Sequence, residues 1–408
     1  MIDRPKKALR IAIVAGEPSG DLLGAGLLRA ITRQWERDSV GGQSGIQIEG
    51  IGGPRMIAAG CHSLAPMERL SVAGLSEALA RVPELLSLRS RLARRFRGAS
   101  HPVLPDVFIG IDAPDFNLSL ERTLRRRGIP VVHYVSPTVW AWRGYRIKKI
   151  ARAVDLMLTL FPFEAAIYAR HGIPARFVGH PLADAIPEAG PDRGEARREL
   201  ALPSAGKVVA LLPGSRLNEV KAMAVPLLQT ARWLTQRRPD LRFVAPFING
   251  VTRDYFEKAR ARVGGGIAIT VLDKQSRAAL AAADAVLVAA GTATLEALLL
   301  QRPMVIALRV SPLTYHMGKA LATVDAVGLP NLLAGRPLAP EFLQKAVIPE
   351  KLGPAVLDIL ENPRAWTRAR AEFRQIGATL RKGADESAAA AVLGLLASRK
   401  RLLEETTP

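Results

Sequence analysis

The chain alternates short apolar runs with longer stretches in which apolar residues recur every three or four positions. Short runs that end in a turn are typical of buried strands, and the stretches between them are typical of helices that cover a sheet. In the first half the runs are 10–15, 46–51, 106–111, 130–135, 155–160 and 175–179. In the second half they are 208–212, 242–248, 267–272, 285–289 and 304–308. The alternation predicts α/β architecture with parallel sheets.

A segment rich in proline, glycine and charge, 181–194, separates the two series of strands. A chain of 408 residues is also too long for one ordinary core. We therefore expect two doubly wound domains, 1–185 and 186–348, that face one cleft. From Pro349 onward the periodicity is helical only, which predicts a helical tail over 349–408 that packs back across the domains.

Two glycine-containing loops follow strands, one in each half. Their notable residues are Ser19, Gly20 and Asp21 in the first loop, and Gly214, Ser215 and Arg216 in the second. A turn from a strand into a helix offers N–H groups and a positive dipole end, which favour an anion. Only the second loop adds a guanidinium, whereas Glu17 and Asp21 would repel a diphosphate. The two halves are therefore expected to bind different ligands.

Two acidic residues of the second half have an ordinary helix-capping explanation. Glu219 stands in a capping-box-like spacing with Ser215, which accounts for both residues without a ligand. The box does not explain Arg216, so we expect its guanidinium to contact a diphosphate. Gly291 and Thr292 precede Glu296, which we expect in the first turn of a helix. That carboxylate either complements the helix dipole or accepts hydrogen bonds from ribose hydroxyls.

The first half carries its own candidate chemistry after two strands. Asp112 follows an apolar run, where a carboxylate either takes a proton from a hydroxyl or holds a loop by hydrogen bonds. Asp115 is suited to the start of the next helix. Residues 134–143 concentrate aromatic and cationic side chains, which form either buried packing or a wall for a sugar, an acyl chain or a phosphate. The polar and aromatic candidates in this segment are Ser136, Trp140 and Arg143.

Residues 76–96 form a basic amphipathic pattern. Its apolar side includes Leu79, Val82, Leu85, Leu86, Leu92 and Phe96. Most such helices cover a sheet, and the alternative is contact with a bilayer or with acyl chains.

Charge and composition limit the classes of molecule that the chain is expected to bind. The chain has 57 Lys and Arg against 37 Asp and Glu, a formal charge of +20, which attracts nucleic acid, anionic lipid or phosphorylated substrates. Only 5% of residues are aromatic and no nucleic-acid module is recognisable, so nucleic acid is disfavoured. One cysteine excludes an internal disulfide framework and fits a reducing cytoplasm. The histidines lack ligand-like spacing, so no metal site is expected.

Neither secretion nor a membrane span is expected from the apolar pattern. The first residues lack the apolar core of a signal peptide. The longest apolar stretch, 278–300, is interrupted by Asp284, Gly291 and Glu296.

An ordered set of motifs resembles the lipid-A-disaccharide synthase family over nearly the whole chain. The motifs are 16–21, 110–117, 134–143, 177–184, 212–216, 291–296 and 330–335. The resemblance implies a GT-B glycosyltransferase with two Rossmann-like domains and no metal or cofactor. It implies a hexosyltransferase that joins UDP-2,3-diacylglucosamine to 2,3-diacylglucosamine 1-phosphate through a β(1→6) bond, with inversion and release of UDP.

Position by position, the resemblance implies that Asp112 is the general base and Arg216 a required donor-side arginine, with Asn331 a required polar residue nearby. The implied donor contacts are Gly214, Ser215, Arg216, Glu219, Gly291, Thr292 and Glu296, and the acceptor-side loops contain Ser19, Gly20, Asp21, Ser136, Trp140 and Arg143. The chain departs from the family pattern at Ala290, where serine is common, and at Phe161, where leucine is usual. Because alanine has no hydroxyl, a hydroxyl contact at position 290 is excluded, and the other implied contacts are little affected.

Because both implied substrates carry acyl chains, the resemblance implies a cytoplasmic protein held peripherally at the inner membrane. Leu79, Val82, Leu85 and Leu86 would contact the bilayer or the acyl chains. The resemblance also suggests a homodimer that exchanges C-terminal segments. Two alternatives stay open: a UDP-sugar 2-epimerase of the same architecture, and a basic nucleotide- or nucleic-acid-binding protein without catalysis.

Overall fold

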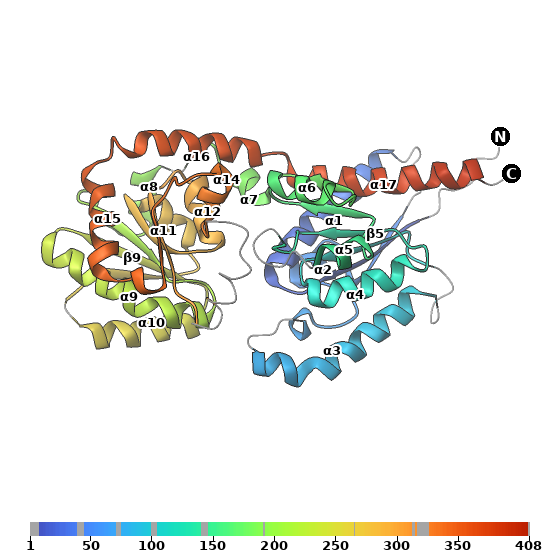
Figure 1. Ribbon diagram of the computed structural model, residues 1–408, viewed down its shortest axis with the longest axis horizontal. Helices are drawn as coiled ribbons and strands as arrows, with labels where there is room; N and C mark the ends of the chain where they lie inside the picture. The colour runs from blue at the N-terminus through green and yellow to red at the C-terminus, as the bar shows by residue number, and fades with distance from the viewer. Residues whose placement is uncertain are drawn as a thin grey trace. The chain divides into compact units, whose positions relative to one another are not determined.

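The chain folds into two compact units. The structure, a computed structural model, describes residues 8–38, 45–70, 75–98, 104–139, 146–190, 192–264, 266–311, 315 and 326–406 (Figure 1). Unit 1 comprises Met1–Pro181 with Leu380–Pro408, and unit 2 comprises Leu182–Thr379. The helical tail is therefore divided between the units.

Unit 1 is built on a parallel sheet with the strand order β3-β2-β1-β4-β5-β6-β7. Its strands are β1 (Leu9–Ala15), β2 (Ile46–Ile51), β3 (His62–Ser63), β4 (Val107–Ile111), β5 (Val131–Tyr134), β6 (Leu156–Thr159) and β7 (Ala175–Phe177). β1 pairs with β2 on one side and with β4 on the other, so the direction of winding reverses between β1 and β4. Such a reversal opens a crevice beyond the strand ends, where ligands bind in this architecture.

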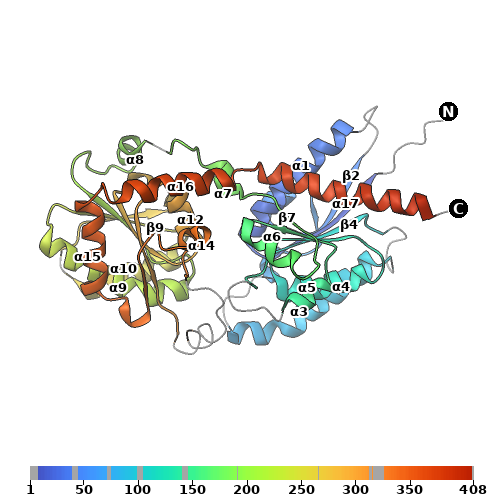
Figure 2. The same ribbon diagram turned by 45° about the horizontal axis from the view of Figure 1, so that its top comes forward.

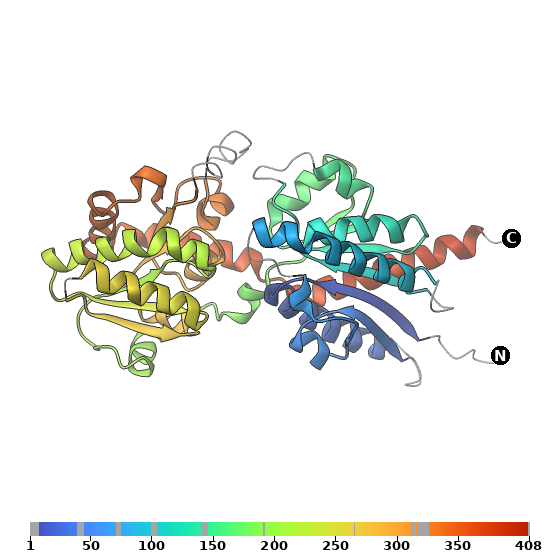
Figure 3. The same cartoon turned by 90° about the horizontal axis from the view of Figure 1, so that it is seen from below.

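Helices cover both faces of this sheet. One face is covered by α1 (Pro18–Asp38) and by α17 (Ala384–Thr406), which lie side by side in Figures 1 and 2. Gly26 permits that contact, because a Cβ there would overlap the Asp385 carboxylate. The other face is covered by α3 (Leu75–Phe96), α4 (Pro114–Arg125) and α5 (Ile147–Ala151), of which α3 and α4 are seen together in light blue and blue-green in Figure 3. The remaining helices are α2 (Pro54–Ala58), the 3₁₀ turn Met67–Arg69 and α6 (Pro162–Ala169).

Unit 2 repeats the same winding with the strand order β10-β9-β8-β11-β12-β13. Its strands are β8 (Val208–Leu212), β9 (Arg242–Phe247), β10 (Ile269–Asp273), β11 (Ala285–Ala289), β12 (Met304–Leu308) and β13 (Glu341–Leu343). Its helices are α8 (Arg193–Glu199), α9 (Leu217–Arg237), α10 (Gly250–Val263), α11 (Ser276–Ala282), α12 (Thr292–Leu299), α14 (Leu329–Ala334), α15 (Pro349–Glu361) and α16 (Trp366–Leu380). The short helix α7 (Pro181–Ala185) spans the boundary between the units. The reversal here lies between β8 and β11.

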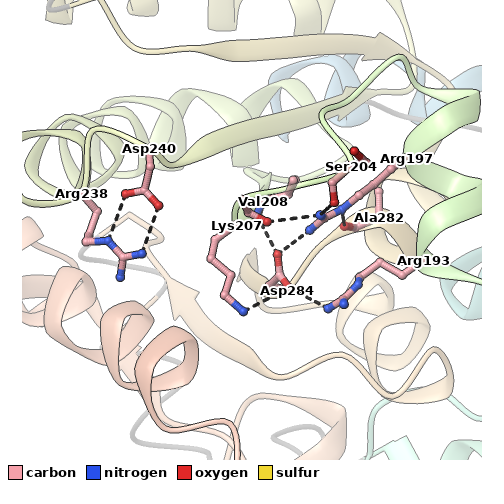
Figure 4. A network of polar contacts seen from close by, with 10 residues as sticks. Arg193, Arg197, Ser204, Lys207, Val208, Arg238, Asp240, Ala282 and Asp284 are labelled. Atoms are coloured by element: carbon pink, nitrogen blue, oxygen red, sulfur yellow. Dashed lines mark hydrogen bonds and ion pairs between the residues drawn. The ribbon is translucent and has the colours of Figure 1, made fainter.

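One buried carboxylate joins the amino-terminal ends of the central strands β8 and β11 of unit 2. Asp284, which precedes β11, accepts hydrogen bonds from Arg197 Nη2 at 2.6 Å and from the Val208 N–H at 2.8 Å (Figure 4). Arg193 Nη1 adds a third contact at 2.7 Å. Because Asp284 joins α8 to the first residue of β8, it fixes that helix against the sheet.

The predicted α/β architecture is confirmed, and each predicted strand is present with ends shifted by at most a few residues. The sequence pattern missed β3 and β13. Both are edge strands of two or three residues, too short for an apolar run to mark them.

Candidate functional site

A cavity of about 410 Å³ lies in unit 2, at the ends of β8 and β11. Its position at the reversal point is where this architecture binds ligands. The cavity is lined by all seven residues that the sequence assigns to the donor side: Gly214, Ser215, Arg216, Glu219, Gly291, Thr292 and Glu296. Residues separated by up to 82 positions in the chain are therefore brought to one wall.

The loop after β8 differs from the expected capping box in one respect. The N-cap of α9 is Arg216, not Ser215, so Glu219 is three residues after the cap. Glu219 Oε2 accepts the Ser215 N–H at 2.9 Å and the Arg216 N–H at 3.1 Å. The expectation that this loop offers free N–H groups is wrong at these two positions. Gly214 is required here, because its φ is +127° and a Cβ would lie 2.5 Å from Glu219 Cβ.

The loop after β11 places a partly buried carboxylate in the same cavity. Gly291 is the N-cap of α12, with a φ of +156°. Glu296 lies in the second turn of that helix, so its predicted place in the first turn is wrong. Burial raises the pKa of Glu296, although the charge of Arg277 and a hydrogen bond from Ser276 Oγ oppose the shift. This carboxylate therefore holds a proton more readily than an exposed glutamate does.

Asn331 lies outside the residues that line this cavity. Its side chain is 4% exposed, and its amide joins α14 to the segment before β13. Asn331 Nδ2 donates to Ala339 O at 2.8 Å and to Glu341 Oε1 at 2.7 Å. Asn331 Oδ1 accepts the N–H groups of Leu338 and Ala339.

A chain of contacts leads from Asn331 back to the cavity. Glu341 also accepts the Gly328 N–H, directly before α14. The next residue, Leu329, donates its N–H to Thr294 Oγ1 on α12 at 3.3 Å. Thr294 Oγ1 in turn donates to the carbonyl of Gly291. Hydrogen bonds therefore connect Asn331 through α14 to α12, the helix whose first turn lines the cavity.

A second cavity of about 500 Å³ lies in unit 1 and contains Asp112. Glu17, Asp112 and Asp115 contribute carboxylates, while Val82, Leu85 and Leu86 of α3 contribute apolar side chains. Asp115 is engaged by Arg146 at 2.6 Å. This cavity combines an acidic end with an apolar wall, which suits a neutral hydroxyl and an alkyl chain better than a diphosphate.

The backbone at Asp112 is held in an uncommon conformation. Asp112 and Ala113 have φ values of +49° and +43°, in the left-handed region that costs about 1 kcal/mol or more for residues with a Cβ. Two hydrogen bonds fix it: the Asp112 N–H donates to Tyr134 O at 2.9 Å, and Asn117 Nδ2 donates to Asp112 O at 2.8 Å. The strain therefore lies at a strand end that faces a cavity.

A buried polar cluster behind Asp112 was missed by the sequence analysis. It consists of Asn117 and Glu121 on α4 and His133 on β5, each 0% exposed. His133 Nδ1 lies 2.6 Å from Glu121 Oε1. Burial alone would lower the pKa of His133, but the charge of Glu121 and its hydrogen bond outweigh it and raise that pKa. A histidine inside an apolar run was the one available signal.

The expected acceptor-side loop residues do not line the Asp112 cavity within the described part of the chain. Asp21 is buried and caps α2, accepting the N–H groups of Arg55 and Met56. Gly20 lies under Ile111, and Ser19 is exposed. Ser136 is buried, with Oγ 2.8 Å from Tyr168 Oη. Trp140 and Arg143 lie outside the described residues.

The amphipathic stripe of α3 divides into two parts. Leu92 and Phe96 are buried in the core of unit 1, together with Leu88. Val82 and Leu86 are 42% and 45% exposed, and Leu85 is half-buried. The Leu79 side chain lies outside the described part. The sheet-covering explanation therefore holds for the second half of the helix and not for Val82 and Leu86.

A model of the family described as lipid-A-disaccharide synthetase matches residues 11–394. The chain belongs to the lipid-A-disaccharide synthase family. A lipid-A-disaccharide synthase of Pseudomonas aeruginosa is 50% identical over 391 residues, which cover 96% of this chain and 99% of that protein. Membership in the lipid-A-disaccharide synthase family makes the chain a glycosyltransferase and disfavours the epimerase alternative.

Solved structures of low sequence identity share the fold. A putative UDP-N-acetylglucosamine 2-epimerase from Listeria monocytogenes has a TM-score of 0.59 at 14% identity, covering 98% of this chain and 97% of that one. The calicheamicin glycosyltransferase CalG4 has a TM-score of 0.57 at 14% identity, covering 98% and 100%. These likenesses show the GT-B fold. In the described part of this lipid-A-disaccharide synthase family member, no helix has the length and apolar character needed to cross a bilayer.

Proposed function

We propose that the chain joins UDP-2,3-diacylglucosamine to 2,3-diacylglucosamine 1-phosphate, forming a β(1→6) disaccharide and releasing UDP. Family membership supports the reaction, and the gathering of every expected donor-side residue around one cavity of unit 2 supports the assignment of the donor site. In this proposal residues 1–185 bind the acceptor and residues 186–348 bind the donor.

The donor cavity is suited to a departing diphosphate. As the bond from the anomeric carbon to the β-phosphate oxygen breaks, negative charge grows on that oxygen. The N–H groups of Ser215 and Arg216 already donate to Glu219, so the guanidinium of Arg216 rather than its backbone carries the stabilisation. The first turn of α12, at Gly291 and Thr292, adds its dipole. Glu296 accepts hydrogen bonds from ribose hydroxyls in this proposal.

The unit 1 cavity is suited to an acylated acceptor. Asp112 takes the proton of the acceptor 6-hydroxyl while that oxygen attacks the anomeric carbon, which inverts its configuration. Val82, Leu85 and Leu86 line the same cavity and offer an apolar surface to the acyl chains. The proposed base and the apolar side chains proposed to contact the acyl chains therefore line one cavity.

Two further parts of the proposal concern the surroundings of the enzyme. The exposed Val82 and Leu86, together with the basic charge, support peripheral association with the inner membrane from the cytoplasmic side. We also propose a homodimer that exchanges C-terminal segments. The chain leaves unit 2 at Thr379 and contributes α17 to unit 1, so exchange requires a change only in this connection.

The reaction is tested by incubating the purified protein with UDP-2,3-diacylglucosamine, with and without the acylated monosaccharide phosphate. We expect UDP release only when the acceptor is present. Release of UDP or formation of an epimer without acceptor would favour the epimerase. Absence of both, together with tight salt-sensitive DNA binding, would favour the non-catalytic alternative. Vesicle sedimentation of the protein with Val82 and Leu86 replaced by serine tests membrane association, and light scattering tests the dimer.

A further inference from the structure

The arginines of α3 differ in their partners. Arg95 Nη2 contacts Glu49 Oε2 at 2.6 Å, and Arg81 Nε contacts Glu84 Oε2 at 3.5 Å. Arg89 is half-buried and lines the Asp112 cavity. Within the described part of the chain its guanidinium has no hydrogen bond or ion pair. A half-buried guanidinium that no carboxylate engages keeps its N–H donors available to an anionic ligand in the cavity.

The cavity supplies the context for that guanidinium. Arg89 is the one cation among the described residues that line it. Val82, Leu85 and Leu86 precede Arg89 at helical spacing, so α3 presents three apolar side chains and then a guanidinium on one face. A ligand that matches this face carries an alkyl chain beside an anionic group. The carboxylates of Glu17 and Asp112 would repel such an anion unless a cation compensates.

We propose that Arg89 binds the phosphate monoester of the acceptor and selects for it, while Val82, Leu85 and Leu86 contact the acyl chains. This inference rests on the proposed function and deepens it by naming the phosphate subsite. The planar fork of a guanidinium bonds two phosphate oxygens at once, and it does so strongly where water is partly excluded. Arg89 also offsets the repulsion between the acceptor phosphate and Asp112.

The test compares two acceptors, 2,3-diacylglucosamine with and without its 1-phosphate, presented with the donor in mixed micelles. We expect the wild-type kcat/KM to favour the phosphorylated acceptor by about 10- to 100-fold. Arg89→Ala should lower kcat/KM for the phosphorylated acceptor by that factor and leave the other acceptor unchanged. Arg89→Lys should recover part of the loss, because it restores the charge without the fork.

Arg91→Ala is the matched control, because Arg91 lies on the same helix, is exposed and does not line the cavity. It should behave as wild type with both acceptors. The inference is overturned if Arg89→Ala keeps the wild-type preference, if both alanine variants lose it equally, or if the wild type has none. Absence of acceptor-dependent UDP release in the wild type would instead overturn the proposed function.

A separate observation concerns the buried cluster of Asn117, Glu121 and His133. Asn117 Oδ1, Glu121 Oε2 and His133 Nε2 are each buried and have no hydrogen-bond partner among the described residues. Gly110 makes room for the cluster, because a Cβ there would overlap Glu121 Oε1. Buried polar atoms of this kind are costly to stability, so they are retained for another reason.

We infer that this cluster positions Asp112. Asn117 Nδ2 is its link, donating to Asp112 O at 2.8 Å and to Ile111 O at 3.3 Å. It thereby holds the left-handed conformation that directs the Asp112 carboxylate. This inference also rests on the proposed role of Asp112 as the base.

Asn117→Asp has nearly the same shape but lacks the amide donor, so it tests the link directly. We expect kcat to fall about tenfold while the acceptor KM and the UDP affinity stay unchanged. His133→Gln, which keeps a donor toward Glu121, should retain more activity than His133→Ala. A folded Asn117→Asp enzyme with wild-type kcat overturns the inference, as does equal loss in the two His133 variants. Wild-type activity in Asp112→Asn would instead remove the base on which the inference rests.

Discussion

The two units share one order of strands but differ in the charge of the residues that follow those strands. In unit 1 the loops after β1 and β4 bring the carboxylates of Glu17 and Asp112 to a cavity. In unit 2 the loops after β8 and β11 bring Arg216 and two glycines, Gly214 and Gly291. The sheet fixes where a ligand binds, and the few residues after each strand decide its charge.

The crossovers that flank the two cavities differ as well. Between β3 and β4, unit 1 carries the 22-residue helix α3, whose first half turns apolar side chains toward Asp112. The corresponding connection of unit 2, between β10 and β11, carries the seven-residue helix α11. In unit 1 an apolar wall therefore comes from this crossover helix, whereas apolar side chains of the unit 2 cavity such as Phe247 and Ile248 lie at the end of β9. We propose that α3 sets the fit of the acceptor acyl chains.

The largest effect is expected when Asp112, the proposed base of unit 1, is neutralised. Asp112→Asn should lower kcat about 1,000-fold, because the amide cannot accept the acceptor proton. UDP affinity should stay at the wild-type level, since the donor cavity is in the other unit. Steady-state kinetics and calorimetric UDP titration measure both quantities. Near-normal turnover in a folded variant would remove Asp112 as the base.

The matching change in unit 2 is Arg216→Gln. We expect kcat to fall about 100-fold and UDP to bind more weakly, because charge on the leaving diphosphate loses its guanidinium. Lys221→Gln on the same helix is the control, since Lys221 does not line the cavity. If the two variants had similar kinetics, the role of Arg216 would reduce to general surface charge.

Acid should lower the stability of unit 1, because this unit contains the buried histidine His180. Burial lowers the pKa of His180 to about 4 from its ordinary 6.5. Between these two pH values His180 is protonated in the unfolded chain but neutral in the folded protein. The free energy of unfolding therefore falls as pH drops from 6.5 toward 4, by at most about 3 kcal/mol. Urea unfolding of the wild type and His180→Gln across this range measures the effect. A pH slope that is equal in both proteins would contradict the assignment.

The smallest expected effect is on the pH dependence of UDP affinity, through the Glu296 carboxylate in the donor cavity. Burial raises the pKa of Glu296, and the ionised form is the one that accepts hydrogen bonds from ribose. UDP affinity should therefore decline as pH falls through this raised pKa, by up to about tenfold. Glu296→Gln should flatten the profile. Parallel profiles of UDP dissociation constant in the two proteins would place Glu296 outside the ribose contact.

The sequence could predict the strands and α17 because their apolar periodicity is local. The helix cap at Arg216 and the second-turn place of Glu296 depend on shifts of one or two residues, which periodicity does not resolve. The hydrogen bonds of Asn331 reach residues seven to ten positions away and could not be anticipated. Glu121 and His133 become partners only when α4 packs beside β5, so neither residue alone indicated a polar cluster.

We propose that the reaction is a single displacement, in which unit 1 activates a hydroxyl and unit 2 stabilises the departing UDP. It is tested most directly by nuclear magnetic resonance of the product made by the purified wild-type enzyme. We expect one β(1→6)-linked disaccharide 1-phosphate, formed in equal amount with UDP. An α-linked product, or UDP formed in excess of disaccharide, would contradict it.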